Sequence, residues 1–182
     1  MTSPSLFQLD SELTLRAKAV RLLVLDVDGV LTDGKLYYGN AGEELKTFCT
    51  LDGQGIKILQ DSGVTIAIIT ARSSTLVNNR AGNLGIRHVI QGASNKLQSL
   101  QQLQVQLGVG MEHTAYVGDD LPDVACIRRV GLGITVANGH MSAKQHAVHT
   151  TTASGGNGAV REVCDLILQA QGNYDSAIAP FL

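Results

Sequence analysis

The sequence contains few cysteines, and their arrangement excludes a disulfide framework and a cysteine-based metal site. Cys49, Cys126 and Cys164 are an odd number of thiols without metal-ligand spacing, so we expect reduced cysteines in a cytoplasmic protein. Cys126 and Cys164 fall on apolar faces of predicted helices, which is typical of core positions. A chain of 182 residues buries about 70% of its unfolded surface, so it needs no disulfide or structural metal to fold.

Long hydrophobic runs and an excess of charge of one sign are missing as well. No apolar run approaches the roughly 20 residues of a membrane span, and the first 20 residues lack the pattern of a signal peptide. The 14 Lys and Arg residues nearly balance 16 Asp and Glu residues, for a net charge of −2. This balance argues against nucleic-acid binding through counterion release. Because no linker or repeat interrupts the chain, we expect one domain over residues 1–182.

What the sequence does contain is an alternation of short apolar runs with helical segments. The runs are continuous rather than alternating with polar residues, which is typical of parallel strands covered on both faces. They lie at residues 22–25, 65–69, 88–90, 114–117 and 132–136. The predicted helices cover residues 11–20, 54–61, 74–84, 95–107, 122–130 and 158–171. This order predicts an α/β fold with a doubly wound, Rossmann-like parallel sheet.

One passage after the first run breaks the alternation. Lys35 to Tyr38, a Gly/Asn-rich turn at 39–42 and a second run at 43–48 predict an inserted β-hairpin over about 34–48. An isolated hairpin is only marginally stable in water. Its apolar residues therefore need another surface, either the parent domain or a neighbouring subunit. We expect Tyr37 and Tyr38 to pack in the hairpin rather than to stack on a substrate.

Acidic, hydroxyl and ammonium side chains follow four of the apolar runs. They are Asp26 and Asp28, Thr70, Lys96, and the acidic group Asp119, Asp120 and Asp123. In an open α/β sheet, the carboxyl ends of the strands meet at one edge, where ligands bind. Clustered carboxylates are costly without a cation, and an all-oxygen ligand set suits Mg²⁺.

These residue types suit phosphoryl transfer through an aspartyl-phosphate. We expect Asp26 to attack phosphorus, and Asp28 to protonate the leaving oxygen and then activate water. Thr70 would donate a hydrogen bond to a phosphoryl oxygen, and Lys96 would offset the charge of Asp26 and the phosphate.

The acidic group after the fourth run is expected to serve the metal. Asp119 would bind Mg²⁺, while Asp120 or Asp123 would orient Asp119 or Lys96 from behind. Asp120 and Asp123 also have the alternative role of complementing the positive end of the helix that begins near Pro122.

In this order, the segments resemble the four motifs of the haloacid dehalogenase superfamily of phosphatases. The motifs are Asp26-Val27-Asp28-Gly29-Val30, Thr70, Lys96 and Gly118-Asp119-Asp120. The hairpin, with the segments 42–46, 68–72 and 158–165, is similar to the cap-less branch of that superfamily. This branch includes phosphatases of 3-deoxy-D-manno-octulosonate 8-phosphate, which act in lipopolysaccharide biosynthesis.

The resemblance implies a metal site, an assembly and a set of substrate contacts. Mg²⁺ would be bound by Asp26, the carbonyl of Asp28 and Asp119. The protein would be a homotetramer without a cap domain, with hairpins packed at its centre and the tail of about 155–182 closing a neighbouring active site. The implied substrate contacts are Asp52, Gly53, Lys57, Arg72, Arg80 and Lys96.

Two positions depart from the pattern of that branch. The loop after the hairpin tends to read Val-Arg-Asp-Gly, but here Leu51 stands in place of the basic residue. Asn157 stands where the tail loop tends to carry Arg or Lys. Leu cannot replace a cation that holds a carboxylate, so a related phosphatase for a different sugar phosphate is an alternative. Two further alternatives are a phospho-accepting signalling module and an inactive scaffold.

Overall fold

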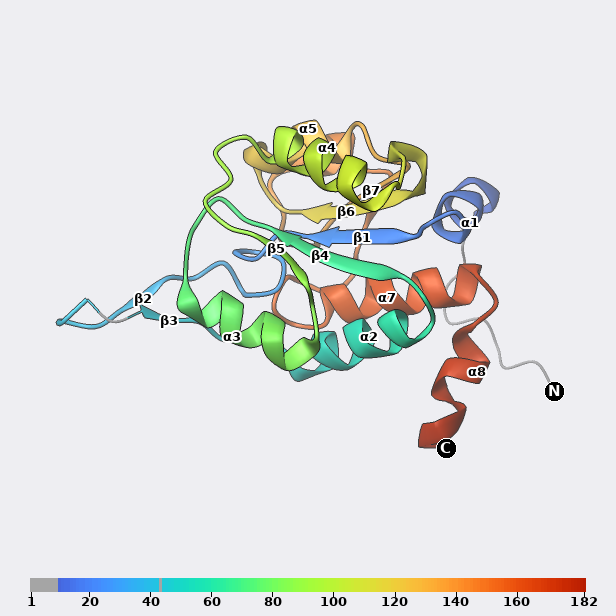
Figure 1. The fold of residues 1–182 in the computed structure, drawn as a ribbon, viewed down its shortest axis with the longest axis horizontal. Helices are drawn as coiled ribbons and strands as arrows, with labels where there is room; N and C mark the ends of the chain where they lie inside the picture. The colour runs from blue at the N-terminus through green and yellow to red at the C-terminus, as the bar shows by residue number, and fades with distance from the viewer. Residues whose placement is uncertain (1–9, 43) are drawn as a thin grey trace.

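The structure is a computed structural model that describes residues 10–42 and 44–182. Its main element is a six-stranded parallel sheet with helices on both faces (Figure 1). The strands of this sheet are β1 (Leu22–Leu25), β4 (Thr65–Ile69), β5 (His88–Ile90), β6 (Thr114–Gly118), β7 (Leu132–Thr135) and β8 (His149–Thr150). The helices are α1 (Ser11–Lys18), α2 (Thr50–Asp61), α3 (Thr75–Leu84), α4 (Lys96–Leu107), α5 (Leu121–Ile127), α6 (Met141–His146), α7 (Ala159–Ala170) and α8 (Tyr174–Ile178), with 3₁₀ turns η1 (Met111–His113) and η2 (Ala179–Phe181).

The strand order is β5-β4-β1-β6-β7-β8, which confirms the predicted doubly wound sheet. β1 pairs with β4 on one side and with β6 on the other, both in parallel. The chain winds outward from β1 in one direction and then in the other, so the carboxyl end of β1 is the switch point of the topology. Ligands of open α/β sheets bind at such a point.

Alternate residues of β1 supply the two hydrophobic cores. Leu23 and Leu25 pack in the core beneath α2 and α7, whereas Leu22 and Val24 pack in the core beneath α4 and α5. All four side chains are completely buried. Burial on both faces explains why the apolar run is continuous, and it fixes the position of the acidic residues that follow.

Most predicted elements are confirmed, but some boundaries are wrong. α2 begins at Thr50, four residues before the predicted start, because the glycine-rich stretch is helical. A Cβ at Gly55 would come within 2.7 Å of the Arg161 side chain, so the helix tolerates glycine where α7 packs closely against it. α5 ends at Ile127, earlier than expected, and the short elements α6, β8 and α8 were not predicted.

The inserted hairpin is shorter than predicted and projects from one end of the molecule (Figure 1). Its strands are β2 (Tyr37–Tyr38) and β3 (Glu44–Leu45), paired antiparallel; Glu43, which the prediction included, lies outside the described residues. Apolar side chains remain exposed along it: Leu36 by 43%, Tyr37 by 42%, Tyr38 by 62% and Leu45 by 64%. The chain's own core therefore does not cover the hairpin.

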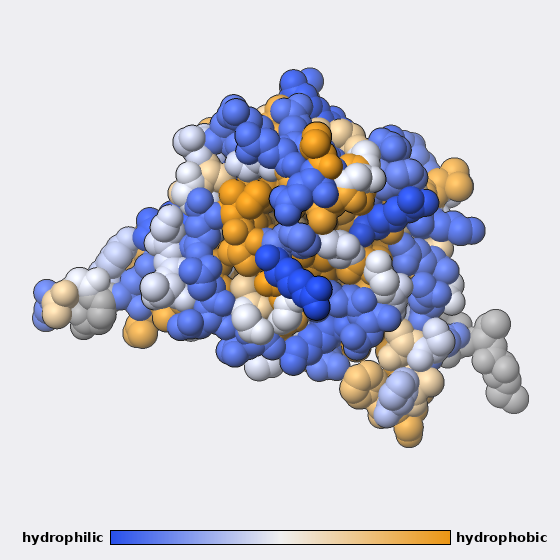
Figure 2. Space-filling view, in the orientation of Figure 1, coloured by the Kyte–Doolittle hydropathy of each residue, from blue (hydrophilic) through white to orange (hydrophobic). Residues whose placement is uncertain are grey.

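The C-terminal segment also extends from the body of the molecule. α7 packs against α2, but α8 and η2 point away from the sheet (Figure 1). Figure 2 shows hydrophobic surface at this end, where Phe181 is 65% and Leu182 is 97% exposed. Within the described ranges, no helix combines the length and the apolar character that crossing a membrane requires.

Candidate active site

The residues predicted from four separate strand ends converge on one cavity of about 260 Å³. It lies at the carboxyl ends of β1, β4 and β6. The predicted residues that line it are Asp26, Asp28, Thr70, Arg72, Lys96, Asp119, Asp120 and Asp123. The topology thus brings together side chains that are up to 97 positions apart in the sequence.

A buried ammonium group links two carboxylates at the base of this cavity. Lys96 Nζ lies 2.9 Å from Asp26 Oδ1 and 2.6 Å from Asp123 Oδ1. Asn95 caps α4 by accepting a hydrogen bond from Gln98 N, which places Lys96 at the first position of the helix. Burial opposes the charge of Lys96, but Asp26 and Asp123 together raise its pKa above the ordinary value. The side chain is therefore a cation fixed beside Asp26.

The oxygen atoms of Asp123 are occupied by hydrogen bonds. Oδ1 accepts from Lys96 Nζ and, at 2.7 Å, from the buried Tyr116 hydroxyl. Oδ2 accepts from the backbone N–H groups of Asp119 and Asp120 at 3.3 Å each. A carboxylate has about four acceptor sites, so Asp123 is suited to orienting Lys96 and the loop after β6.

A cation could be held by carboxylate oxygens of the same cluster. One oxygen each of Asp26, Asp119 and Asp123 lie within 4.8 Å of one another. Burial raises the pKa of Asp26 to about 7, helped by the Asp123 charge and opposed by Lys96. Burial and the same Asp123 charge raise the pKa of Asp119 to about 6. A bound divalent cation would stabilise the ionised form of both carboxyl groups, so that they lose their protons when it binds.

The loop after β1 is shaped by close contacts that only certain residues permit. Gly29 has φ of +96°, and a Cβ at this position would overlap the Asp119 carboxylate. The buried Thr32 hydroxyl accepts hydrogen bonds from Gly29 N at 3.3 Å and Gly34 N at 3.2 Å. The tail loop closes over this turn, where Gly156 N donates to Val30 O at 2.9 Å. The turn over residues 29–34, directly after Asp28, is therefore held from both sides.

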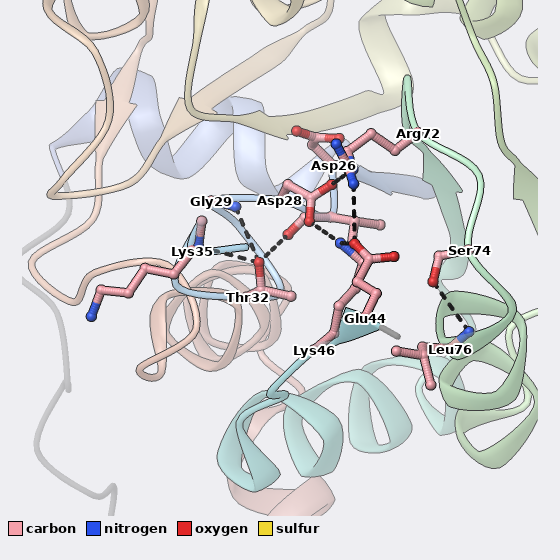
Figure 3. Close-up of polar contacts among 12 residues, drawn as sticks. Asp26, Asp28, Gly29, Thr32, Lys35, Glu44, Lys46, Arg72, Ser74 and Leu76 are labelled. Carbon is pink, nitrogen blue, oxygen red and sulfur yellow. Dashed lines mark hydrogen bonds and ion pairs between the residues drawn. The ribbon is translucent and has the colours of Figure 1, made fainter. Parts of the chain in front are cut away.

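Asp28 is contacted by the hairpin, and the sequence did not predict this contact. Lys46 Nζ donates a hydrogen bond to Asp28 Oδ1 and lies 3.4 Å from Glu44 Oε1 (Figure 3). Arg72, after β4, lies with its Nε 3.7 Å from Asp28 Oδ2 and its Nη2 3.1 Å from Glu44 Oε1. Lys46 stood in a segment that resembles the cap-less branch, but nothing in its local sequence indicated a contact with Asp28.

Four of the expected substrate contacts do not line this cavity. The Asp52 carboxylate is buried and accepts a hydrogen bond from Arg161 N at 2.8 Å, so it holds the beginning of α7. Gly53 lies against Arg80, whose Nη2 donates to Cys49 O at 3.1 Å. Lys57 lines a separate cavity between α2 and the C-terminal segment. Within the described residues of one chain, these side chains contact backbone groups and other elements, so their expected role in substrate binding stays a prediction.

The two departures from the family pattern also lie outside the cavity. Leu51 is on the first turn of α2 with 58% of its surface exposed. Asn157 is an exposed residue of the tail loop, and its Nδ2 donates to Gly155 O at 3.4 Å. Neither side chain contacts the acidic cluster within the described part of the chain.

Comparisons with known proteins agree with this geometry. A family profile of haloacid dehalogenase-like hydrolases matches residues 86–163. The chain is 48% identical over 167 residues to 3-deoxy-D-manno-octulosonate 8-phosphate phosphatase KdsC of Escherichia coli (strain K12), covering 92% of this chain and 89% of that protein.

Solved structures of phosphatases are also similar to this chain in sequence and in fold. The 3-deoxy-D-manno-octulosonate 8-phosphate phosphatase of Moraxella catarrhalis, in complex with magnesium ion, phosphate ion and KDO, is 48% identical with a TM-score of 0.93, covering 94% of this chain and 98% of that one. A probable YrbI family phosphatase from Pseudomonas syringae is 53% identical with a TM-score of 0.93 and the same coverage.

Proposed function

We propose that the protein hydrolyses 3-deoxy-D-manno-octulosonate 8-phosphate with Mg²⁺, through a phosphorylated Asp26. The premise is its family: the chain belongs to the haloacid dehalogenase-like phosphatases, in the family of 3-deoxy-D-manno-octulosonate 8-phosphate phosphatases. It is a phosphoric monoester hydrolase, as its relatives are. The convergence of Asp26, Lys96 and Asp119 on one cavity supports the proposal most directly.

In the first step, an oxygen of Asp26 attacks phosphorus and the bond from phosphorus to the sugar oxygen breaks. Asp28 gives its proton to that departing oxygen, so the sugar leaves as a neutral alcohol. In the second step, a water molecule attacks phosphorus and gives a proton to Asp28. Inorganic phosphate leaves, and the Asp26 carboxylate is restored.

The other residues of the cavity hold the phosphoryl group and balance its charge. The buried Thr70, at the end of β4, donates a hydrogen bond to a phosphoryl oxygen, and Lys96 stabilises the charge beside Asp26. Mg²⁺ would be bound by Asp26, Asp119 and the Asp28 carbonyl, and when bound it neutralises charge on the phosphoryl oxygens. Asp123 orients Lys96, and Asp120 begins α5 by accepting a hydrogen bond from Leu121 N at 2.7 Å.

A panel of turnover assays tests the proposed activity and substrate. With Mg²⁺, the purified protein should release phosphate from 3-deoxy-D-manno-octulosonate 8-phosphate faster than from other sugar phosphates, and a chelator should stop the release. A different preferred substrate would favour the alternative of a related sugar phosphatase, which the unusual Leu51 and Asn157 support. No release from any sugar or aryl phosphate would favour the inactive scaffold.

Binding of Mg²⁺ should weaken as the pH falls below 7. Without metal, Asp26 and Asp119 retain protons up to pH values near 7 and 6, and the cation must displace them. Between pH 7.5 and pH 5.5, we expect the dissociation constant of Mg²⁺ to rise by roughly 10- to 100-fold. Isothermal titration of metal-free protein at the two pH values measures this change. An affinity that does not change with pH would contradict the assignment of these two ligands.

The exposed hairpin supports the proposal that the protein forms a homotetramer. Leu36 and Leu45 are 43% and 64% exposed, and burial in an assembly would remove this apolar surface from water. Light scattering at micromolar concentration should give four times the chain mass of 19.2 kDa. The paired change Leu36→Ser and Leu45→Ser should lower the measured mass, whereas Val105→Ser, at an exposed position on α4, should not. A monomeric wild-type protein would contradict the proposal.

A further inference from the structure

The hairpin contributes a buried cation to the active site. Only 1% of the Lys46 side chain is exposed, although the neighbouring Leu45 is 64% exposed. Lys46 directly follows β3 and continues its alternation, so the Leu45 side chain points outward and the Lys46 side chain inward. Lys46 Nζ is directed at Asp28 Oδ1, with Glu44 Oε1 at 3.4 Å on its other side (Figure 3).

These contacts are part of a closed ring of four charged side chains. Lys46 contacts Asp28 and Glu44, and Arg72 contacts the same two carboxylates at 3.7 Å and 3.1 Å. The Tyr38 hydroxyl accepts a further hydrogen bond from Arg72 Nη2 at 2.9 Å. The ring therefore connects the hairpin, the loop after β1 and the loop after β4. Of its members, Asp28 and Arg72 line the cavity, whereas Lys46 lies behind Asp28.

The burial of Lys46 calls for a reason other than stability. Removing an ammonium group from water is costly, and its attraction to the carboxylates of Asp28 and Glu44, each 20% exposed, only offsets this cost. Replacing a buried ion pair with apolar side chains of similar volume often leaves stability unchanged or higher. What an apolar side chain cannot do is donate a hydrogen bond to Asp28. With Oδ1 fixed by Lys46, the other carboxylate oxygen has a defined direction.

We propose that Lys46 is a positioning residue, which holds Asp28 in the orientation from which it exchanges a proton with the leaving oxygen and then with water. This inference rests on the proposed role of Asp28. It gives the hairpin a function in catalysis besides its proposed function in assembly. Because Lys46 does not line the cavity, it acts through Asp28 and not on the substrate.

Replacement of Lys46 with Met tests this role, because Met retains much of the side-chain length and lacks the ammonium group. Misplacement of a reacting group by about 1 Å costs on the order of 100-fold in rate. We therefore expect kcat for a sugar phosphate to fall by roughly 10- to 100-fold in Lys46→Met, with little change in KM. Lys46→Arg, which keeps a cation and a donor, should restore part of the loss. Lys35→Met, an exposed lysine of the same segment, is the matched control and should behave as wild type.

The choice of leaving group distinguishes a misoriented Asp28 from a distortion of the whole active site. Dinitrophenolate leaves without a proton, so the first release of one equivalent from dinitrophenyl phosphate should stay fast in Lys46→Met, even though later turnovers are slow. An equal loss of the first release from the sugar ester and from the aryl ester would overturn the inference, because it would indicate a distorted site.

A double-mutant cycle shows whether Lys46 acts through Asp28. In an Asp28→Asn background, Lys46→Met should lower kcat by less than about 2-fold further. Multiplication of the two losses would mean that Lys46 acts independently and would overturn the inference. If Asp28→Asn itself turns over normally, the proposed role of Asp28 fails. If Asp28→Asn is impaired while Lys46→Met behaves as wild type, only the inference about Lys46 fails.

Discussion

Replacement of Asp26 with asparagine is expected to lower kcat for phosphate release by a factor on the order of 10⁴ or more. The amide cannot attack phosphorus, and among the described residues it leaves the buried Lys96 ammonium with Asp123 as its remaining ion-pair partner. The change also removes one of the proposed ligands of Mg²⁺. Phosphate release by the variant, measured with saturating substrate, gives the size of the loss.

A second acidic residue of the same loop is the matched control. Asp33 lies seven residues after Asp26, and its carboxylate accepts a hydrogen bond from Lys35 N at 3.0 Å outside the cavity. Asn can accept the same bond, so Asp33→Asn should retain wild-type turnover. Activity of Asp26→Asn within tenfold of wild type would mean that another group attacks phosphorus.

Replacement of Asp28 with asparagine should separate the two steps of the reaction. Asn cannot donate a proton to the sugar oxygen or accept one from water, so kcat should fall by roughly 10²- to 10⁴-fold. An aryl phosphate, whose leaving group needs no proton, should still phosphorylate Asp26. Rapid mixing should therefore show a burst of one equivalent of aryl alcohol per site, followed by slow turnover.

Two outcomes for Asp28→Asn would contradict the proposed role of Asp28. If steady-state turnover of the sugar phosphate is unchanged, Asp28 does not transfer the proton. If the burst disappears together with turnover, the variant has lost the first step too, and the separation of roles between Asp26 and Asp28 is wrong. Thermal unfolding of both variants shows whether either change acts through stability.

The parallel sheet and the convergence of the acidic residues could be predicted from the sequence because both depend on local patterns. The continuous apolar run of β1 indicated a strand buried on both faces, and Asp26 follows it directly. The rules of α/β topology then place the ends of β4 and β6 beside it. Thr70 and Asp119 needed no further information to be assigned to the same edge.

The contacts that the sequence did not predict depend on where distant segments pack. Asp52 lies in a motif that suggested substrate binding, but its carboxylate holds the start of α7, 109 positions away at Arg161. The local sequence around Lys46 is typical of an exposed hairpin lysine. Its contact with Asp28 depends on how the hairpin packs against the loop after β1. In both cases the same local residues permit several partners, and the tertiary packing selects one.

The most direct test of the account is to locate the phosphoryl group during turnover. Wild-type protein is mixed with Mg²⁺ and 3-deoxy-D-manno-octulosonate 8-phosphate, quenched with acid in the steady state, and digested for peptide mass spectrometry. We predict one phosphoryl group on the peptide that contains Asp26, and none on that peptide from Asp26→Asn. Phosphate release without phosphorylation of Asp26, or phosphorylation of another residue, would contradict the account.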